Sequence, residues 1–164
     1  MEHPFRPKSN RFLLPGQFWA IPLENGKFAC GRVIETEPDS RTGFLAGLMD
    51  WLSDAPPMPA DLKGCKVVSQ GSVHIKTVHK TGLNGMILGY LPLTEDDITP
   101  FFFKSQEMLA DNCLLMQGYK VMRPASKEES EKYATFSTWG YEFIKALAEV
   151  KLLNQETEEH KYLL

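Results

Sequence analysis

The sequence lacks the short motifs that mark the common catalytic sites. It has no G-x-S-x-G, no P-loop, no H-E-x-x-H, and no G-x-G-x-x-G after an expected strand. Each of these patterns places a nucleophile, a phosphate cradle or a metal at the spacing that its chemistry requires. Their absence predicts a protein that is not an enzyme, with no catalytic residue and no cofactor.

Metal-ligating patterns are equally scarce. Cys30, Cys65 and Cys113 lie far apart, are odd in number and form no C-x-x-C, which excludes a disulfide framework and a cysteine zinc site. We interpret them as reduced, mostly buried thiols of a cytoplasmic protein. His74 and His79 are an odd number of residues apart, so one continuous strand would place them on opposite faces. The sequence predicts no metal site.

An excess of basic residues is also absent. The 164 residues include 18 Lys and Arg against 21 Asp and Glu, and the net charge is -3. This balance excludes nucleic-acid binding through a broadly basic face. Long apolar runs are missing too, because Pro15, Gly16 and Pro22 interrupt "FLLPGQFWAIPL". No signal peptide and no membrane span are therefore expected.

The chain does have the composition of one globular domain, with 43% hydrophobic and 24% charged residues. We expect a flexible polar arm over residues 1–11, a single β-rich domain with a C-terminal helix over 12–154, and a polar tail over 155–164. Strand-like segments precede helical ones, which predicts an α+β, mainly β fold. The expected architecture is an antiparallel twisted sheet or a small half-open β-barrel, with one or two C-terminal helices.

Patterns of β-branched and apolar residues place the later strands and the helices. Residues 43–54 fit a short helix or a buried strand, and we favour the strand because two glycines interrupt the segment and turns flank it. Further strand-like segments are expected on both sides of Gln70-Gly71 within 65–82, over 86–93 and over 113–124. Ser126 and Glu129 have the spacing of a capping box before a short helix. Apolar residues then recur at helical spacing from Trp139 to Val150, which predicts a second helix of about four turns.

The stretch "PGQFWAIPLENGKFACGRVIE" predicts a β-hairpin at the start of the domain. In its simplest form, Asn25 and Gly26 make a two-residue type I′ turn, in which both residues have positive φ. Trp19 then faces Arg32 across the strands, as a cation–π pair that holds the sheet. A three-residue turn would shift the pairing and change these partners.

The same register has consequences for the small residues of the hairpin. Ala20 would meet Gly31 on the reverse face, and we predict that another element packs against the notch that they form. Pro22 has no N–H to give to the ladder, which indicates an edge or a bulge at this point of the first strand.

Two surface features are candidates for binding another protein. Glu95, Asp96 and Asp97 form a run of like charge beside an apolar segment; such a run is either a solvated turn or an acidic patch that complements a basic partner. Trp51 lies close to Asp54 and just before a proline-rich loop. It is either a core residue at a strand end or an aromatic anchor with an acidic rim.

The hairpin and the later segment "MILGYLPL" resemble the immunity protein 26 family of bacterial polymorphic toxin systems. The matching positions are Gly16, Phe18, Ala20, Ile21, Pro22, Leu23, Gly26, Phe28, Gly31, Arg32, Val33, Gly89, Pro92 and Leu93. The structural residues of the motif are taken as Gly16, Pro22, Asn25, Gly26, Gly31, Arg32, Gly89 and Pro92. Gln17 stands where the family often has Asp, and Met86 where it commonly has an aromatic residue. The resemblance extends over residues 12–103.

The resemblance implies a mainly β protein that binds and neutralises a cognate toxin, and it supplies no catalytic residue. A mildly acidic inhibitor suits a basic toxin surface, such as that of a nuclease. Two other functions stay open. A small-barrel enzyme of ribonuclease type would show a basic groove with Arg32, Arg41 or Lys76 beside a histidine. A small-ligand module would show a deep apolar pocket between the sheet and the C-terminal helix.

Overall fold

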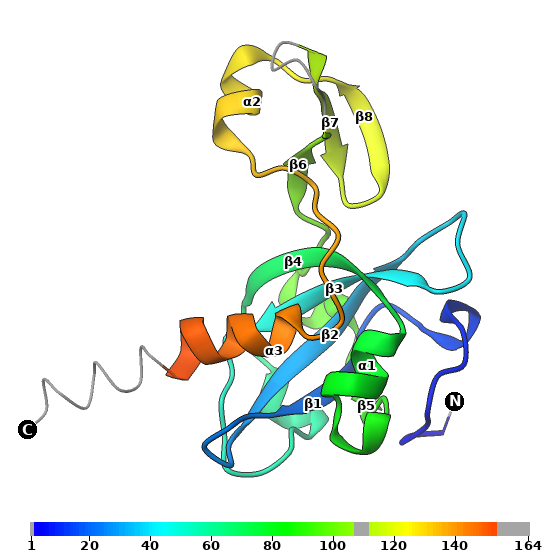
Figure 1. Ribbon diagram of the computed structural model, residues 1–164, viewed down its shortest axis with the longest axis vertical. Helices are drawn as coiled ribbons and strands as arrows, with labels where there is room; N and C mark the ends of the chain where they lie inside the picture. Colours follow the sequence, from blue (N-terminus) through cyan, green and yellow to red (C-terminus); the bar gives the residue numbers. More distant parts are fainter. Residues whose placement is uncertain (1, 107–111, 154–164) are drawn as a thin grey trace, which may run out of the picture.

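The computed structural model describes residues 2–106 and 112–153 and contains two antiparallel sheets (Figure 1). The strands are β1 (Gln17–Pro22), β2 (Phe28–Thr36), β3 (Gly43–Met49), β4 (Val67–His74), β5 (Gly89–Tyr90), β6 (Phe102–Lys104), β7 (Leu114–Gln117) and β8 (Lys120–Pro124). The α-helices are α1 (Lys76–Thr81), α2 (Lys127–Lys132) and α3 (Phe143–Ala148), which a π-helical turn continues over Glu149–Leu153. Short 3-10 helices cover Asn10–Phe12, Pro59–Leu62, Leu83–Gly85 and Leu93–Asp96.

The larger sheet is open. Its strand order is β4-β3-β2-β1-β5, so β4 and β5 are opposite edges, and the sheet does not close into a barrel. The smaller sheet has the order β6-β7-β8. With α2 it forms a separate group at one end of the molecule (Figure 1), which we call the small lobe. The predicted α+β, mainly β class is confirmed, and of the two expected architectures the antiparallel sheet is correct.

The opening hairpin forms, but in the alternative register. Gly26 N–H donates to the Leu23 carbonyl at 3.1 Å, and Leu23 N–H donates to the Lys27 carbonyl at 2.8 Å, which closes a three-residue loop. Gly26 alone takes a positive φ, of +83°, whereas the predicted type I′ turn requires two such residues. Asn25 stays in an ordinary conformation and accepts the Lys27 N–H on Oδ1 at 3.0 Å, which stabilises the longer loop.

This shift of one residue moves Arg32 to the opposite face from Trp19. Trp19 pairs with Gly31, and Phe18 pairs with Arg32, so the predicted cation–π pair is wrong. Ala20 and Gly31 are both buried, but they lie on different faces, so the predicted notch that they would share does not form. The Trp19 indole fills the space beside Gly31: a Cβ there would lie 2.3 Å from Cζ2 of the ring.

Three later segments also depart from the sequence pattern. The expected strand over 113–124 is two antiparallel strands, β7 and β8. The second β-branched stretch of 65–82 forms α1, which buries Val78 completely; tertiary packing of an apolar side chain outweighs a weak strand propensity here. The predicted strand 86–93 is reduced to the two residues of β5. Residues 43–49 do form a strand, and both of its faces are buried.

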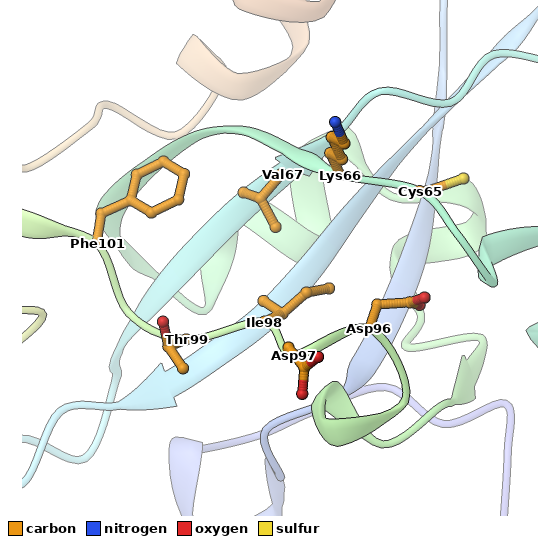
Figure 2. Close-up of a pocket in the computed structure, with 8 residues that line it drawn as sticks. All are labelled: Cys65, Lys66, Val67, Asp96, Asp97, Ile98, Thr99 and Phe101. Carbon is orange, nitrogen blue, oxygen red and sulfur yellow. The ribbon is translucent and has the colours of Figure 1, made fainter.

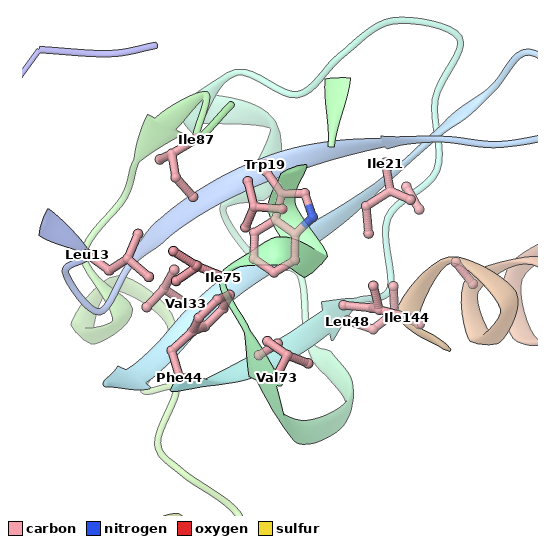
Figure 3. Close-up of a cluster of buried hydrophobic side chains, with 14 of the residues drawn as sticks. Leu13, Trp19, Ile21, Val33, Phe44, Leu48, Val73, Ile75, Ile87 and Ile144 are labelled. Carbon is pink, nitrogen blue, oxygen red and sulfur yellow. The ribbon is translucent and has the colours of Figure 1, made fainter. Parts of the chain in front are cut away.

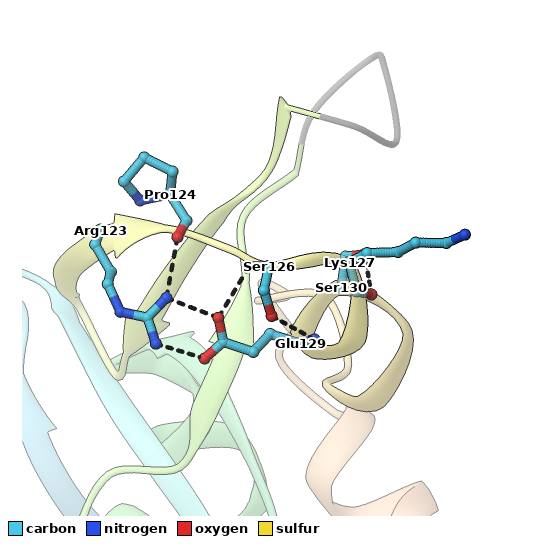
Figure 4. A network of polar contacts seen from close by, with 6 residues as sticks. All are labelled: Arg123, Pro124, Ser126, Lys127, Glu129 and Ser130. Carbon is cyan, nitrogen blue, oxygen red and sulfur yellow. Dashed lines mark hydrogen bonds and ion pairs between the residues drawn. The ribbon is translucent and has the colours of Figure 1, made fainter.

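The C-terminal part contains both predicted helices, with different bounds for the second. Ser126 accepts the Glu129 N–H at 3.2 Å, and Glu129 accepts the Ser126 N–H at 2.9 Å, so the capping box before α2 is confirmed. Arg123 adds a forked ion pair to Glu129, at 2.7 and 2.8 Å (Figure 4). The second helix begins at Phe143 rather than Trp139, because the backbone N–H of Trp139 donates to the Ser72 carbonyl of β4 instead of entering a helix.

Two hydrophobic clusters lie on the two faces of the larger sheet. The main cluster joins Trp19, Phe44 and Leu48 to residues of α1 and α3, among them Ile144 (Figure 3). The small cluster, on the face of Phe18, consists of Phe18, Cys30, Met49, Leu62 and Leu91. No helix α1–α3 contributes to it, and loops cover it instead.

The N-terminal arm makes defined contacts with the domain. Phe5 and Ile87 exchange backbone hydrogen bonds at 3.0 and 2.8 Å, and Asn10 Nδ2 donates to the carbonyls of Ser40 and Gly43 at 2.8 Å. The flexibility of residues 1–11 and the single-domain boundaries stay predictions, which hydrogen exchange would test. The predicted tail over 155–164 lies outside the described residues.

Candidate functional site

Two loops meet over the small cluster and form the candidate partner-binding surface, residues 50–66 and 93–99, here called the acidic face. Gly64 N–H donates to Asp96 Oδ1 at 2.8 Å, which ties the loops together. Trp51 of the first loop and Ile98 of the second both pack against the small cluster. The structure thus brings the two sequence-predicted features to the same side of the molecule.

The acidic face concentrates the negative charge of the chain. Its two segments contain six carboxylates and only two lysines, while the whole chain has a net charge of -3. The rest of the molecule is therefore close to neutral. The carboxylates are Asp50, Asp54, Asp61, Glu95, Asp96 and Asp97. A mainly negative surface in an otherwise balanced molecule attracts partners of the opposite charge.

The predicted residues differ in their exposure. Asp54, Glu95 and Asp97 are exposed, whereas Trp51 is half-buried. Asp96 is half-buried too. One of its carboxylate oxygens accepts the Gly64 N–H, and the other is buried with no hydrogen-bond partner in the described structure. Asp96 therefore positions the two loops, while its neighbours in the run face solvent.

A hollow of about 250 Å³ lies between the two loops (Figure 2). Its lining residues are Cys65, Lys66, Val67, Asp96, Asp97, Ile98, Thr99 and Phe101. Phe101 stands at the end opposite Cys65 (Figure 2). The volume is below the range of about 300–1,000 Å³ that small-molecule sites usually have, and it is the size of a side chain from a docked protein.

The cysteines near this hollow are poor nucleophiles. Burial raises the pKa of the Cys65 thiol, and the carboxylates of Asp50 and Asp96 raise it further. Burial also raises the pKa of Cys30, which is completely enclosed. Because the thiolate is the reactive form, neither residue has the environment of a catalytic cysteine.

The structure also locates the residues that a ribonuclease would use. Arg32 is completely buried, and its pKa is lowered by burial. Its Nη2 donates to the Leu91 carbonyl, its Nε lies 3.5 Å from the Gly16 carbonyl, and Nη1 has no partner among the described residues. Arg32 therefore joins the start of β1 to the end of β5 and is inaccessible to a nucleic acid.

A histidine does stand beside Lys76. His74 Nδ1 accepts the Lys76 N–H at 3.0 Å, and Tyr141 packs edge-on against the His74 ring. Burial, followed by Lys76 and His79, lowers the pKa of His74. The lone pair on Nδ1 is already engaged by the Lys76 N–H and is not free to take a proton from a substrate. This arrangement does not provide a general base.

Sequence reasoning missed one exposed residue on the acidic face. Met58 is 68% exposed in the proline-rich loop, where Asp61 accepts its N–H at 2.8 Å. Methionine is enriched at protein interfaces because its unbranched side chain adapts to irregular surfaces. The sequence feature that could have predicted this exposure is the position of Met58 between two prolines, which favour a surface loop.

A metal site and a membrane-spanning helix find no support in the described part of the chain. No group of three His, Cys, Asp or Glu residues within 2–106 and 112–153 could hold a metal ion. Among the same residues, no helix has the length and apolar character needed to cross a bilayer.

These features define a mainly β protein of the α+β class whose distinguishing surface is acidic and formed by loops. A profile of the family described as Immunity protein 26 matches residues 14–113. The chain belongs to this family, as the hairpin motif suggested. The match includes β1–β6 and both loops of the acidic face, whereas β7, β8, α2 and α3 lie beyond it. No curated protein and no solved structure matches the chain.

Proposed function

We propose that the chain neutralises a cognate toxin of a polymorphic toxin system by direct contact, without catalysis. Membership of the immunity protein 26 family supports the role of neutralisation. The concentration of six carboxylates on two adjoining loops is the observation that carries the mode of binding. A toxin with a basic active surface, such as a nuclease domain, is the partner that this charge favours.

The proposed contact uses Trp51 as the apolar anchor and Asp54, Glu95 and Asp97 as its charged rim. Anchors that are partly buried beforehand lose little conformational entropy on binding, and charged rims mainly raise the association rate. Asp96 contributes by holding the two loops in register through Gly64. We place this activity in the cytoplasm, where cysteines such as Cys65 remain reduced.

The test pairs this chain with the product of the gene immediately upstream. That product is expressed alone and with the chain, and growth and co-purification are measured. We expect toxicity alone, rescued growth together, and a stable complex. A product that is toxic but neither bound nor neutralised would contradict the proposal for that pair.

Charge-reversal variants then locate the contact. Glu95→Lys with Asp97→Lys, and separately Trp51→Ala, should each weaken the complex about tenfold or more, equivalent to about 1.4 kcal/mol. The matched control is Glu128→Lys with Glu131→Lys, two exposed carboxylates on α2. Unchanged affinity of the first two variants would remove the acidic face from the interface. Circular dichroism checks that each variant is folded.

A further inference from the structure

A second, apolar surface lies where the small lobe meets the larger sheet. Two adjoining hollows of about 360 and 430 Å³ share Phe101, Phe103 and Ala134 as lining residues. The first lies between β4 and α3, and the second extends along the small lobe to the end of α2. We call the two together the aromatic groove; its principal residues are Phe101, Phe103, Tyr133, Trp139, Phe143 and Leu147.

The walls of the groove are fixed by packing and by backbone hydrogen bonds. Residues 134–139 run beside both sheets: Lys104 N–H donates to the Ala134 carbonyl, and Ser72 N–H donates to that of Ser137. The Trp139 indole covers Gly71, where a Cβ would lie 2.1 Å from the ring. The groove is therefore formed before any partner binds, which lowers the entropic cost of filling it.

Aromatic rings stay open to solvent along this groove. Phe101 is 37% exposed, Phe102 at its edge 40% and Phe143 45%. A contiguous exposed group of rings marks an interaction surface. Rings left this open suit a contact with another protein better than a ligand that must be largely enclosed.

The two ends of the groove are cationic. Lys132 lines the second hollow and lies over the Tyr133 ring, 5.2 Å from its centroid. Lys151 Nζ bonds the Ser69 hydroxyl, at 3.2 Å, on the wall of the first hollow. Neither ammonium group has a carboxylate partner among the described residues. An occupant that carries carboxylates at both ends would supply these missing charges.

The aromatic groove is continuous with the acidic face. Phe101 lines both hollows of the groove and also the hollow of the acidic face, and Thr99 lines two of the three. A protein docked on the acidic face would therefore reach the groove by passing over Phe101. The sequence named a pocket between the sheet and the C-terminal helix only as the sign of a small-ligand site, and it did not indicate that the small lobe completes the groove, because β4, the small lobe and α3 are distant in the chain.

We infer that the aromatic groove binds a segment of the same toxin, apolar in its middle and acidic at both ends. This inference rests on the proposed function and adds a second half to its interface. The acidic face receives the basic surface of the toxin, and the groove receives a segment of opposite character. The acidic face and the groove together fix the orientation of the toxin, because a rotated toxin would place charges of the same sign opposite each other.

The experiment measures the Kd of the purified upstream gene product for three sets of variants. The groove set is Phe102→Ala with Phe143→Ala, two exposed rings that do not line the hollow of the acidic face, and Lys132→Glu with Lys151→Glu. The control set is Phe12→Ala and Lys80→Glu, an exposed aromatic residue and an exposed lysine outside the three hollows. The third set consists of the acidic-face variants described above.

We expect each groove variant to weaken the complex about tenfold or more, and each control to change Kd less than about twofold. If the groove variants bind like the wild type while the acidic-face variants bind weakly, the inference is overturned and the proposed function stands. If the wild type itself forms no complex, both are overturned. A small molecule that copurifies with the chain, is seen by native mass spectrometry and is lost in Phe143→Ala would also overturn the inference.

Discussion

The contact between Gly71 and Trp139 gives the sharpest stability prediction. Gly71 lies in the middle of β4 with no positive φ, so alanine fits its backbone. Its Cβ, however, would lie 2.1 to 2.4 Å from three atoms of the Trp139 indole. Since real Cβ contacts are longer than 3.0 Å, Gly71→Ala must push the ring away from the sheet.

The size of the effect follows from two opposing terms. Overpacking of this kind costs about 1–3 kcal/mol, and replacing glycine by alanine in an unstrained position recovers about 0.4–1 kcal/mol from the unfolded state. We therefore expect Gly71→Ala to lower the free energy of unfolding by about 1–2 kcal/mol. For a chain of this length that is a fall in Tm of about 2–8 °C.

A double-mutant cycle tests the reasoning. Trp139→Ala alone should cost about 2 kcal/mol, because a half-buried indole loses part of its packing. Once the ring is gone, the added methyl group meets no indole, so Gly71→Ala with Trp139→Ala should be at least as stable as Trp139→Ala. Urea unfolding followed by far-UV circular dichroism measures all four proteins. A double variant whose loss equals the sum of the two single losses would refute the steric argument.

Three further predictions concern the turn, the small lobe and a thiol. Gly26→Ala should cost about 1 kcal/mol in urea unfolding, because the turn needs a left-handed residue, whereas Gly140→Ala, with nothing within 4 Å and no positive φ, should be neutral or slightly stabilising. Arg123 and the Ser126 N–H lower the pKa of Glu129 to about 2. The ionised carboxylate therefore stabilises α2 fully above pH 4.5, and this contribution is lost as the pH falls toward 2. NMR titration should find that low pKa in the wild type and a higher value in Arg123→Met. Cys65 should react with a disulfide reagent more slowly at pH 8 than a free thiol does. The Asp50→Asn variant should react faster than the wild type, because the Asp50 carboxylate raises the pKa of the Cys65 thiol. Equal rates in the two proteins would contradict that electrostatic effect.

Some elements could be predicted from neighbouring residues alone. The capping box of Ser126 and Glu129 needs only residues three apart, and the strand at 43–49 follows from apolar residues flanked by turn formers. The motif around Gly26 and Gly31 identified the family, because the turn at Gly26 and the contact of Gly31 with Trp19 both lie within one hairpin.

Other elements could not be read in this way. The first hairpin fits two turns that differ by one residue, and the choice decided whether Trp19 faces Arg32 or Gly31. The stretch containing Val78 has strand-like residues, but burial of that side chain beneath the sheet makes it helical. Local propensities amount to tenths of a kcal/mol, and tertiary packing exceeds them.

The candidate surfaces show the same difference between what neighbouring residues predict and what tertiary packing decides. The sequence alone determined that the chain is one acidic, mainly β protein of the immunity protein 26 family, and it identified Trp51 and the run Glu95 to Asp97. Only the tertiary structure decided that Asp96 serves the fold while its neighbours face solvent, and that Phe101 joins the acidic face to an aromatic groove. The reason is physical: composition and short motifs are properties of neighbouring residues, whereas a surface is made by segments that only the folded chain brings together.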